Sequence, residues 1–329
     1  MDDLTLSQTT WRSQDAWLIA GPGLELVVSV IGAQLAAIRA PGDTLNPLWQ
    51  PPWPACTPAE GAARSETYGS DAPTAALLAN IVGHNPCIDR FGPPHPGEDR
   101  PPHGEAGAVP WTVSVGGPDR VLLEAQLPVA GLQLTRSIAL DGETAAVHTV
   151  VRHDDDAPRE IEWAEHATLG SPFIDGADFT AGVDGAWIWS GEPRETWRFP
   201  TATDEGPVDP AEALAMPEPD APPCGDIITT RVTEGLFRVA NIAVGRELIY
   251  RWDAEAFPWL CLWTQHRSRD GKPWNGATRA RGMEFATKPF PDGLPSQERG
   301  REFHNRPTVC MVPPGAGLEQ TFTITWARL

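Results

Sequence analysis

Apolar and polar residues alternate in two runs near the start of the chain, in LELVVSVIGAQLAAIRAPGD from Leu24 to Asp43. A period of two places one face of a β-strand in a core and the other face toward solvent. Gly32 separates the two runs, and the turn-forming residues APGD end the second run. The pattern predicts an antiparallel β-hairpin.

The same alternation returns between residues 111 and 169, in the segments WTVSV, RVLLEAQLP, LQLTRSIAL, TAAVHTVVRH and EIEWAEHATL. Turn sequences such as GGPD, LDGE and DDDAPRE join these segments. They predict an antiparallel meander in which the acidic run Asp154 to Asp156 is a solvated turn. Further strands are expected late in the chain, in ELIYRWD, WLCLWTQHR, GMEFAT and TFTITWARL.

Three segments interrupt the strand pattern. Residues 50–72 predict an irregular loop, and the following TAALLANIVG fits either a short helix or a buried strand. Residues 83–111 are so rich in proline and glycine that continuous helix and central strand are both disfavoured. A loop of this length in a folded domain is usually functional or disordered, and its histidines and Arg90 favour function.

The pattern as a whole predicts an all-β protein. Strands of similar style occur at both ends of the 329-residue chain, and no internal repeat is visible. All-β folds often exceed the ~150 residues of an ordinary domain. We therefore expect residues 1–329 to form a single antiparallel β domain, with a proline-rich insertion around residues 205–223 that holds at most two helical turns.

The composition limits the classes of partner that the protein can bind. The 44 acidic and 25 basic residues give a formal net charge of −19, which repels phosphate backbones and anionic membrane surfaces. The first residues, MDDLTLSQTTW, lack the charge and apolar run of a secretory signal, and no apolar stretch is long enough to span a membrane. We expect a cytoplasmic monomer or homodimer with no nucleic-acid or membrane partner.

Cysteine and tryptophan usage adds two expectations. The five cysteines form no CxxC pair, which argues against a disulfide framework and a thiolate zinc site and favours buried thiols. The 14 tryptophans, beside only 2 tyrosines, suit either a core or stacking on sugar rings. Both interpretations stay open for Trp49, Trp53, Trp259 and Trp263.

Candidate chemistry begins in the strand EIEWAEHATL. Alternation places Glu162 and His166 on a polar face with small neighbours, opposite a face that is apolar except for Glu165. In RGMEFAT, Glu284 faces away from the apolar Met283 that precedes it and Phe285 that follows it. Each of these groups is also compatible with an ordinary solvated or structural residue.

Two residues of the long loop complete the candidate set. His103 follows a proline in PPHGEAG, where it is either a site residue or part of a surface turn. Arg90, in CIDRFGPP, either contacts a ligand or pairs only with Asp89 or Glu98.

The order of these motifs resembles the galactose mutarotase-like, or aldose 1-epimerase, superfamily over nearly the whole chain. The motifs that carry the resemblance are, in order, the hairpin GAQLAAIRAPGD, a loop arginine, HGEAGAVPW, the meander ending in EWAEHATLGSPF, and GMEFAT. The resemblance implies a large antiparallel β-supersandwich that binds a sugar on a concave sheet face. It implies no metal and no organic cofactor.

The same resemblance implies roles for the candidate residues. His166 corresponds to the general acid on the sugar ring oxygen, and Glu284 to the general base that deprotonates the anomeric hydroxyl. His103 corresponds to a second histidine at the ring oxygen, and Arg90 to an arginine that contacts sugar hydroxyls. Trp263 is a candidate for stacking on the sugar.

Departures from the family pattern indicate a divergent member. HATLGSPF stands where HPYF is usual, Phe285 stands where a proline often follows the glutamate, and Asp89 replaces the asparagine before the arginine. Asp253 and Asp270 are both candidates for the aspartate that grips distal hydroxyls.

We therefore predict an isomerase of carbohydrate metabolism that interconverts sugar anomers. A neutral sugar is favoured because the chain shows no basic cluster for a phosphate. One alternative is a non-catalytic carbohydrate-binding protein on the same fold. The other is a metal-dependent isomerase that uses imidazoles and carboxylates from His84, His95, His103, Glu105, Glu162, Glu165 and His166.

Overall fold

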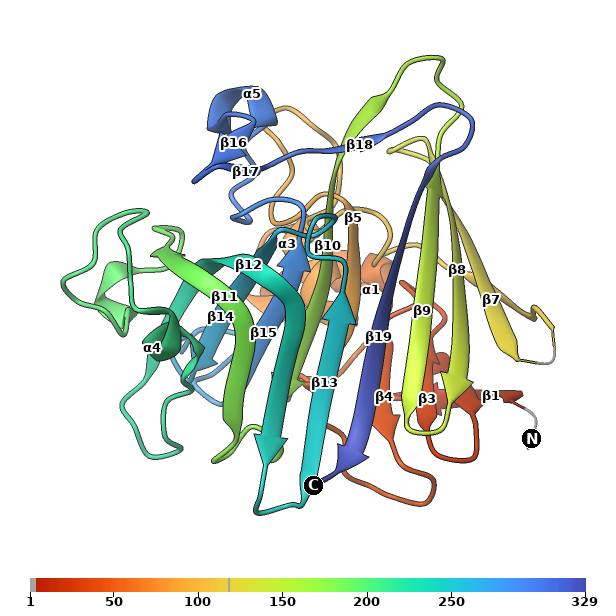
Figure 1. The fold of residues 1–329 in the computed structure, drawn as a ribbon, viewed down its shortest axis with the longest axis horizontal. Helices are drawn as coiled ribbons and strands as arrows, with labels where there is room; N and C mark the ends of the chain where they lie inside the picture. Colours follow the sequence, from red (N-terminus) through yellow and green to blue (C-terminus); the bar gives the residue numbers. More distant parts are fainter. Residues whose placement is uncertain (1–3, 118) are drawn as a thin grey trace.

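β-Strands are the main regular element of the computed structural model, which describes residues 4–117 and 119–329 (Figure 1). Seventeen strands belong to one hydrogen-bonded sheet, and its assigned ladders are all antiparallel. One series of paired strands contains β1 (Thr5–Trp11), β2 (Gln14–Ala20), β3 (Glu25–Ser29), β4 (Leu35–Arg39), β5 (His84–Asp89), β10 (Arg159–Gly170), β15 (Arg279–Ala286) and β14 (Trp259–His266). A second series contains β6 (Thr112–Val115), β7 (Arg120–Leu127), β8 (Leu132–Asp141), β9 (Thr144–Arg152), β19 (Leu318–Arg328) and β13 (Arg246–Trp252).

The long strand β12 (Cys224–Asn241) connects the two series. Its first half pairs with β14 and its second half with β13, while β11 (Asp178–Ile188) runs along its other edge. Register shifts between Ala181 and Gly185 mark an irregularity in the β11–β12 pairing, which lets β11 stay paired with both halves of β12. β18 (Cys310–Val312) adds to the start of β10, and β16 (Glu302–Phe303) pairs only with β17 (Arg306–Pro307).

Helices are few and short. They are α1 (Pro58–Ala63), α2 (Ser65–Tyr68), α3 (Ala72–Asn80), the 3-10 turn η1 (Arg194–Thr196), α4 (Pro210–Leu214) and α5 (Ser296–Arg299). The side chain of Asp71 caps α3 by accepting from the backbone N–H of Thr74, which settles the ambiguous TAALLANIVG segment as helix. No helix in the described part of the chain is both long and apolar enough to cross a membrane.

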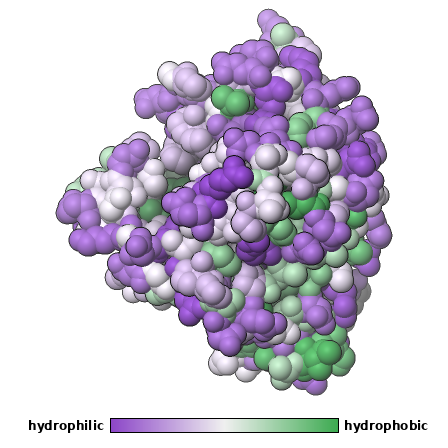
Figure 2. All heavy atoms as spheres, turned by 90° about the vertical axis from the view of Figure 1, so that its left-hand side faces the viewer, coloured by the Kyte–Doolittle hydropathy of each residue, from purple (hydrophilic) through white to green (hydrophobic). Residues whose placement is uncertain are grey.

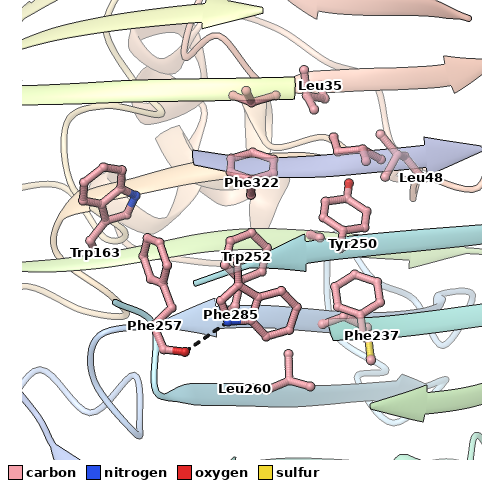
Figure 3. Packing of buried hydrophobic residues seen from close by; sticks show 14 of the residues in the cluster. Leu35, Leu48, Trp163, Phe237, Tyr250, Trp252, Phe257, Leu260, Phe285 and Phe322 are labelled. Carbon is pink, nitrogen blue, oxygen red and sulfur yellow. Dashed lines mark hydrogen bonds between the residues drawn. The ribbon is translucent and has the colours of Figure 1, made fainter. Parts of the chain in front are cut away.

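The hydrophobic core lies between the two series of strands (Figure 3). Phe285 of β15 stacks on Trp252 of β13 with ring centroids 4.6 Å apart, and it meets Phe322 of β19 at 5.3 Å. Trp252 donates its indole N–H to the carbonyl of Phe257, so its polar atom is satisfied inside the core. The face beside α4 is mainly hydrophilic, with apolar groups in smaller areas, as the strongly acidic composition requires (Figure 2).

Most elements that alternation predicts are present. The predicted hairpin is β3–β4, which follows an unpredicted hairpin β1–β2; the meander is β6 to β10, and Asp154 to Asp156 lie in an exposed connection. The all-β prediction is confirmed. The five cysteines are free, three of them buried, also as expected.

The prediction that residues 83–111 form only a loop is wrong at their start. Residues 84–89 form β5, a fully buried strand along β10. Pro86 is tolerated there because β5 pairs with β4 only at His84, so no second neighbouring strand needs a donor at Pro86.

Candidate active site

His166 and Glu284 face each other across the β10–β15 pair, on the side of the sheet that points away from the core. They are direct partners in the strand register, and His166 Nε2 lies 3.2 Å from Glu284 Oε1. The neighbours Met283 and Phe285 belong to the core, as the alternation predicts. The two strands therefore bring an imidazole and a carboxyl group together with no loop between them.

Gly282 makes room for the carboxyl group. A Cβ atom at this position would lie 2.2 Å from Glu284 Oε1 and 3.0 Å from the Cβ of Trp263. Oε1 is buried and makes no properly aligned hydrogen bond to any described residue. A buried, unpartnered carboxyl oxygen at a cavity wall is available to a ligand.

Burial sets the protonation of the pair. It raises the pKa of Glu284 to about 8, despite the opposing charge of Arg281. Burial also lowers the pKa of His166 well below 6.5, and His103 adds to this effect. At neutral pH both groups are therefore uncharged: Glu284 keeps its carboxyl proton and the imidazole of His166 is neutral.

His103 approaches the pair from the long loop, with its ring centroid 5.1 Å from that of His166. Its backbone has φ of +64°, and its N–H donates to the carbonyl of Gly92 at 2.7 Å. Its Nδ1 lies 3.3 Å from the thiol sulfur of Cys87 and accepts the N–H of Gly92 at 3.4 Å. Burial lowers the pKa of His103 to about 4, so the ring is neutral.

A cavity of about 560 Å³ opens above these residues. The acid–base end is lined by His103, His166 and Glu284, with Gly92 and Pro291 beside them. The rest of the wall consists mainly of aromatic and aliphatic side chains: Trp49, Leu77, Leu78, Ile81, Trp189, Ile227, Trp263 and Trp274. A concave apolar site with a few convergent polar groups is the usual form of a small-molecule site.

Trp263 joins the two parts of the cavity. Its ring centroid lies 6.4 Å from His166 and 5.9 Å from Trp274, which is stacked parallel to Trp49. The sequence left open whether the tryptophans fill a core or line a site. Three tryptophans both pack in a buried cluster and line the cavity: Trp49, Trp263 and Trp274. Trp259 is completely buried and does not line the cavity.

Two charged residues that the sequence analysis missed lie in the cavity wall. The guanidinium of Arg269 lies 5.5 Å from the ring centre of Trp263 and 5.0 Å from that of Trp274. It pairs with the buried carboxylate of Glu192. Both residues come from irregular segments, where no periodic pattern predicts the direction of a side chain.

Arg90 is placed differently from the other candidates. Its guanidinium donates to Glu98 and Asp89 and does not line the cavity. This is the structural pairing that the sequence left open, and a contact with sugar stays a prediction from the resemblance. Asp253 and Asp270 are exposed, and neither lines the cavity.

The residues considered for a metal site are divided among separate places. His84 pairs with Glu165 at 2.8 Å on the core side of the sheet. His95 pairs with Glu162 at 2.7 Å, where the buried ammonium of Lys288 joins them. Among residues 4–117 and 119–329, no three His, Cys, Asp or Glu side chains are grouped to hold a metal ion.

Comparisons with known proteins rest on structure alone. No protein-family model and no curated protein sequence matches this chain. A Salmonella typhimurium protein described as a "putative mutarotase (YeaD)" is 14% identical and superposes with a TM-score of 0.65, over 100% of this chain and 96% of its own. Galactose mutarotase-like proteins from Clostridium acetobutylicum and Lactobacillus casei give TM-scores of 0.62 and 0.61 at 10% and 13% identity, over 99% and 95% of this chain and 99% and 100% of theirs.

The chain has the galactose mutarotase-like fold. This confirms, for the fold, the resemblance seen in the order of the sequence motifs. At 10–16% identity the neighbours share an architecture, and the chemistry of this chain rests on its own residues.

Proposed function

We propose that the chain is a mutarotase of the aldose 1-epimerase type, which opens and recloses the ring of a sugar by acid–base catalysis. The observation that carries the proposal is the His166–Glu284 pair, joined in register, 3.2 Å apart and facing a cavity. Ring opening removes the proton from O1 and adds one to O5. An acid and a base must therefore reach two oxygens bound to the same carbon.

The proton balance of the pair suits this reaction. Transfer of the carboxyl proton from Glu284 to His166 gives a carboxylate base and an imidazolium acid. The carboxylate takes the O1 proton, the imidazolium protonates O5, the C1–O5 bond breaks and the C1–O1 bond becomes a carbonyl. Rotation about C1–C2 and reversal of both proton transfers give the other anomer, and the pair returns to its first state.

The other cavity residues are assigned to binding. Neutral His103 donates from Nε2 to the ring oxygen, and Trp263 offers an aromatic surface to the C–H face of the ring. Arg269 and Glu192 take the distal hydroxyls as donor and acceptor. Because Glu192 already balances the charge of Arg269, the site suits an uncharged sugar better than a sugar phosphate.

A carbohydrate-binding protein without catalysis is the alternative on the same fold. Such a protein would not need an acid and a base on one face and within reach of one carbon. The 3.2 Å separation between His166 Nε2 and Glu284 Oε1 therefore supports the enzyme.

The test is anomer exchange measured by NMR over a panel of neutral aldoses, sugar acids and sugar phosphates, with chelator present. We expect exchange with at least one neutral aldose, and a decrease of about 10²- to 10⁴-fold in His166→Ala and in Glu284→Gln. The double variant should be no slower than the slower single variant, because the pair acts as a unit. Sugar binding by the wild type without exchange above buffer would replace the enzyme with the binding protein.

A further inference from the structure

We propose that Cys87 is a positioning residue for His103: its thiol donates to Nδ1 and fixes the imidazole tautomer whose Nε2–H faces the cavity. The consequence for the rate rests on the proposed function. The tautomer itself does not, and it can be measured without any substrate.

The backbone of Gly92 decides the direction of these hydrogen bonds. An amide N–H can only donate, and that of Gly92 points at His103 Nδ1 at 3.4 Å. Nδ1 must therefore be the unprotonated nitrogen, and the proton of the neutral ring is on Nε2. Since Nδ1 accepts, the thiol at 3.3 Å must be the donor.

The surroundings of the thiol agree with this direction. The side-chain amide of Asn85 donates to Cys87 Sγ at 3.6 Å, so the sulfur already accepts one hydrogen bond. The other acceptor near its proton is the carbonyl of Asn85, at 3.8 Å. Burial, with Glu284 nearby, raises the pKa of Cys87 well above its ordinary value, so the thiol keeps the proton that it donates.

Neither partner can easily move away. Cys87 lies in β5, completely buried and paired with Ala164 of β10. His103 is held by its own N–H bond to Gly92 and by a backbone in the left-handed region. The following residue, Gly104, has φ of +76° and lies so close to the Ile88 carbonyl that a Cβ atom would be 2.4 Å from it.

The fixed tautomer separates binding from proton transfer. His166 from β10 and Cys87 from β5 lie beside His103, and Glu284 from β15 lines the same end of the cavity. With Nδ1 occupied, His103 has no free basic nitrogen, and it offers one permanent donor to a ligand oxygen. Proton transfer is then left to His166 and Glu284.

The experiment compares Cys87→Ala with Cys87→Ser, whose hydroxyl keeps a donor. Cys56→Ala is the control, because Cys56 is also buried and hydrogen-bonded, but its partner is the hydroxyl of Tyr68 at 3.2 Å and not His103. Long-range ¹⁵N–¹H NMR spectra report the tautomer and the pKa of His103, whose signals are assigned by their loss in His103→Gln. Anomer exchange is followed against pH in parallel.

In wild type and in Cys87→Ser we expect the Nε2–H tautomer. In Cys87→Ala we expect a mixture of tautomers, and a pKa of His103 raised by about one unit, the equivalent of one ordinary hydrogen bond. Exchange should fall about tenfold in Cys87→Ala, recover in Cys87→Ser and change less than twofold in Cys56→Ala.

A wild-type His103 that carries its proton on Nδ1 overturns the proposal, even if no variant folds. An unchanged tautomer and pKa in folded Cys87→Ala overturns it as well. If the wild type shows the expected tautomer but exchanges no sugar, the proposed function fails and the role of Cys87 stands.

Discussion

His166 and Glu284 are opposite each other in the β10–β15 ladder, so the sheet itself sets the 3.2 Å between the imidazole and the carboxyl group. Neighbouring strands are rigid supports, since each residue is fixed by hydrogen bonds on both sides. His166 also has Asn85 of β5 as its partner on the other edge. The proposed acid and base are thus placed before any ligand binds, as efficient proton transfer requires.

The proposed exchange of one proton between Glu284 and His166 predicts a bell-shaped pH profile for anomer exchange. The rate should fall as the pH rises through about 8, where Glu284, raised to that pKa by burial, loses the proton and no acid remains. It should also fall on the acid side, where His166 gains a second proton and no base remains. This limb lies below 6.5, because burial lowers the pKa of His166. Initial rates of exchange between pH 4 and 10 measure both limbs.

A descending limb that stays near pH 8 in Glu284→Gln would assign that limb to another group. With the proposed pair, the variant loses the limb together with most of the activity.

The same carboxyl group should make the protein less stable as the pH rises. Below 4.5 it is protonated in the folded and the unfolded chain. Between 4.5 and about 8 only the unfolded chain releases the proton, which favours unfolding, and above about 8 both forms are ionised. In this window the free energy of unfolding should fall by up to about 1.4 kcal/mol per pH unit from this group alone.

Urea unfolding of wild type and Glu284→Gln at several pH values isolates the effect. The difference in stability between the two proteins should change through this window and level off outside it. A difference that does not vary with pH would mean that Glu284 titrates normally in the folded protein.

Local patterns in the sequence could predict the strands and the face on which each side chain lies. They could not predict every residue that a side chain contacts in the folded protein. Alternation places His166 and Glu284 away from the core because a period of two depends only on adjacent residues. It cannot explain Glu165, which points into the core. That carboxylate is satisfied by His84 and Arg136, from strands distant in the sequence.

Other site features escape the sequence because tertiary contacts create them. Cys87 lies in a segment whose Pro86 argues against a strand, and only the missing β4 partner makes that strand possible. Arg269 and Glu192 lie in irregular segments that only packing brings together. The one feature of the sequence that relates to this part of the site is Gly191, which leaves space for the ring of Trp189 over the backbone next to Glu192.

Gly282 should be required for activity and much less for folding. In Gly282→Ala the new methyl group would lie 2.2 Å from Glu284 Oε1 and force the carboxyl group away from His166. A displacement of about 1 Å at a reacting group can cost about 10²-fold in rate, so we expect a loss of that order. Anomer exchange and circular dichroism measure the two effects.

Gly271→Ala is the matched control, because Gly271 has open space around its Cβ position and no positive φ. It should keep wild-type exchange. Full activity in Gly282→Ala would show that the carboxyl group does not need its position over Gly282.

Arg269 and Glu192 should determine which sugars bind, with little effect on the chemical step. Their ion pair lies in the cavity wall, with Arg269 against Trp263 and Trp274, where we expect it to meet distal hydroxyls. Arg269→Lys keeps the charge but loses the planar fork of donors, and Glu192→Gln keeps the shape but loses the charge. Each should raise KM for a neutral aldose about tenfold and leave kcat within about threefold, as loss of uniform binding predicts.

Glu192→Gln should also improve binding of sugar acids relative to neutral sugars, because it leaves the Arg269 guanidinium without its counter-charge. Kinetics of both variants on a neutral aldose and its C6 acid measure these ratios, and a loss confined to kcat would place the pair in the chemical step instead.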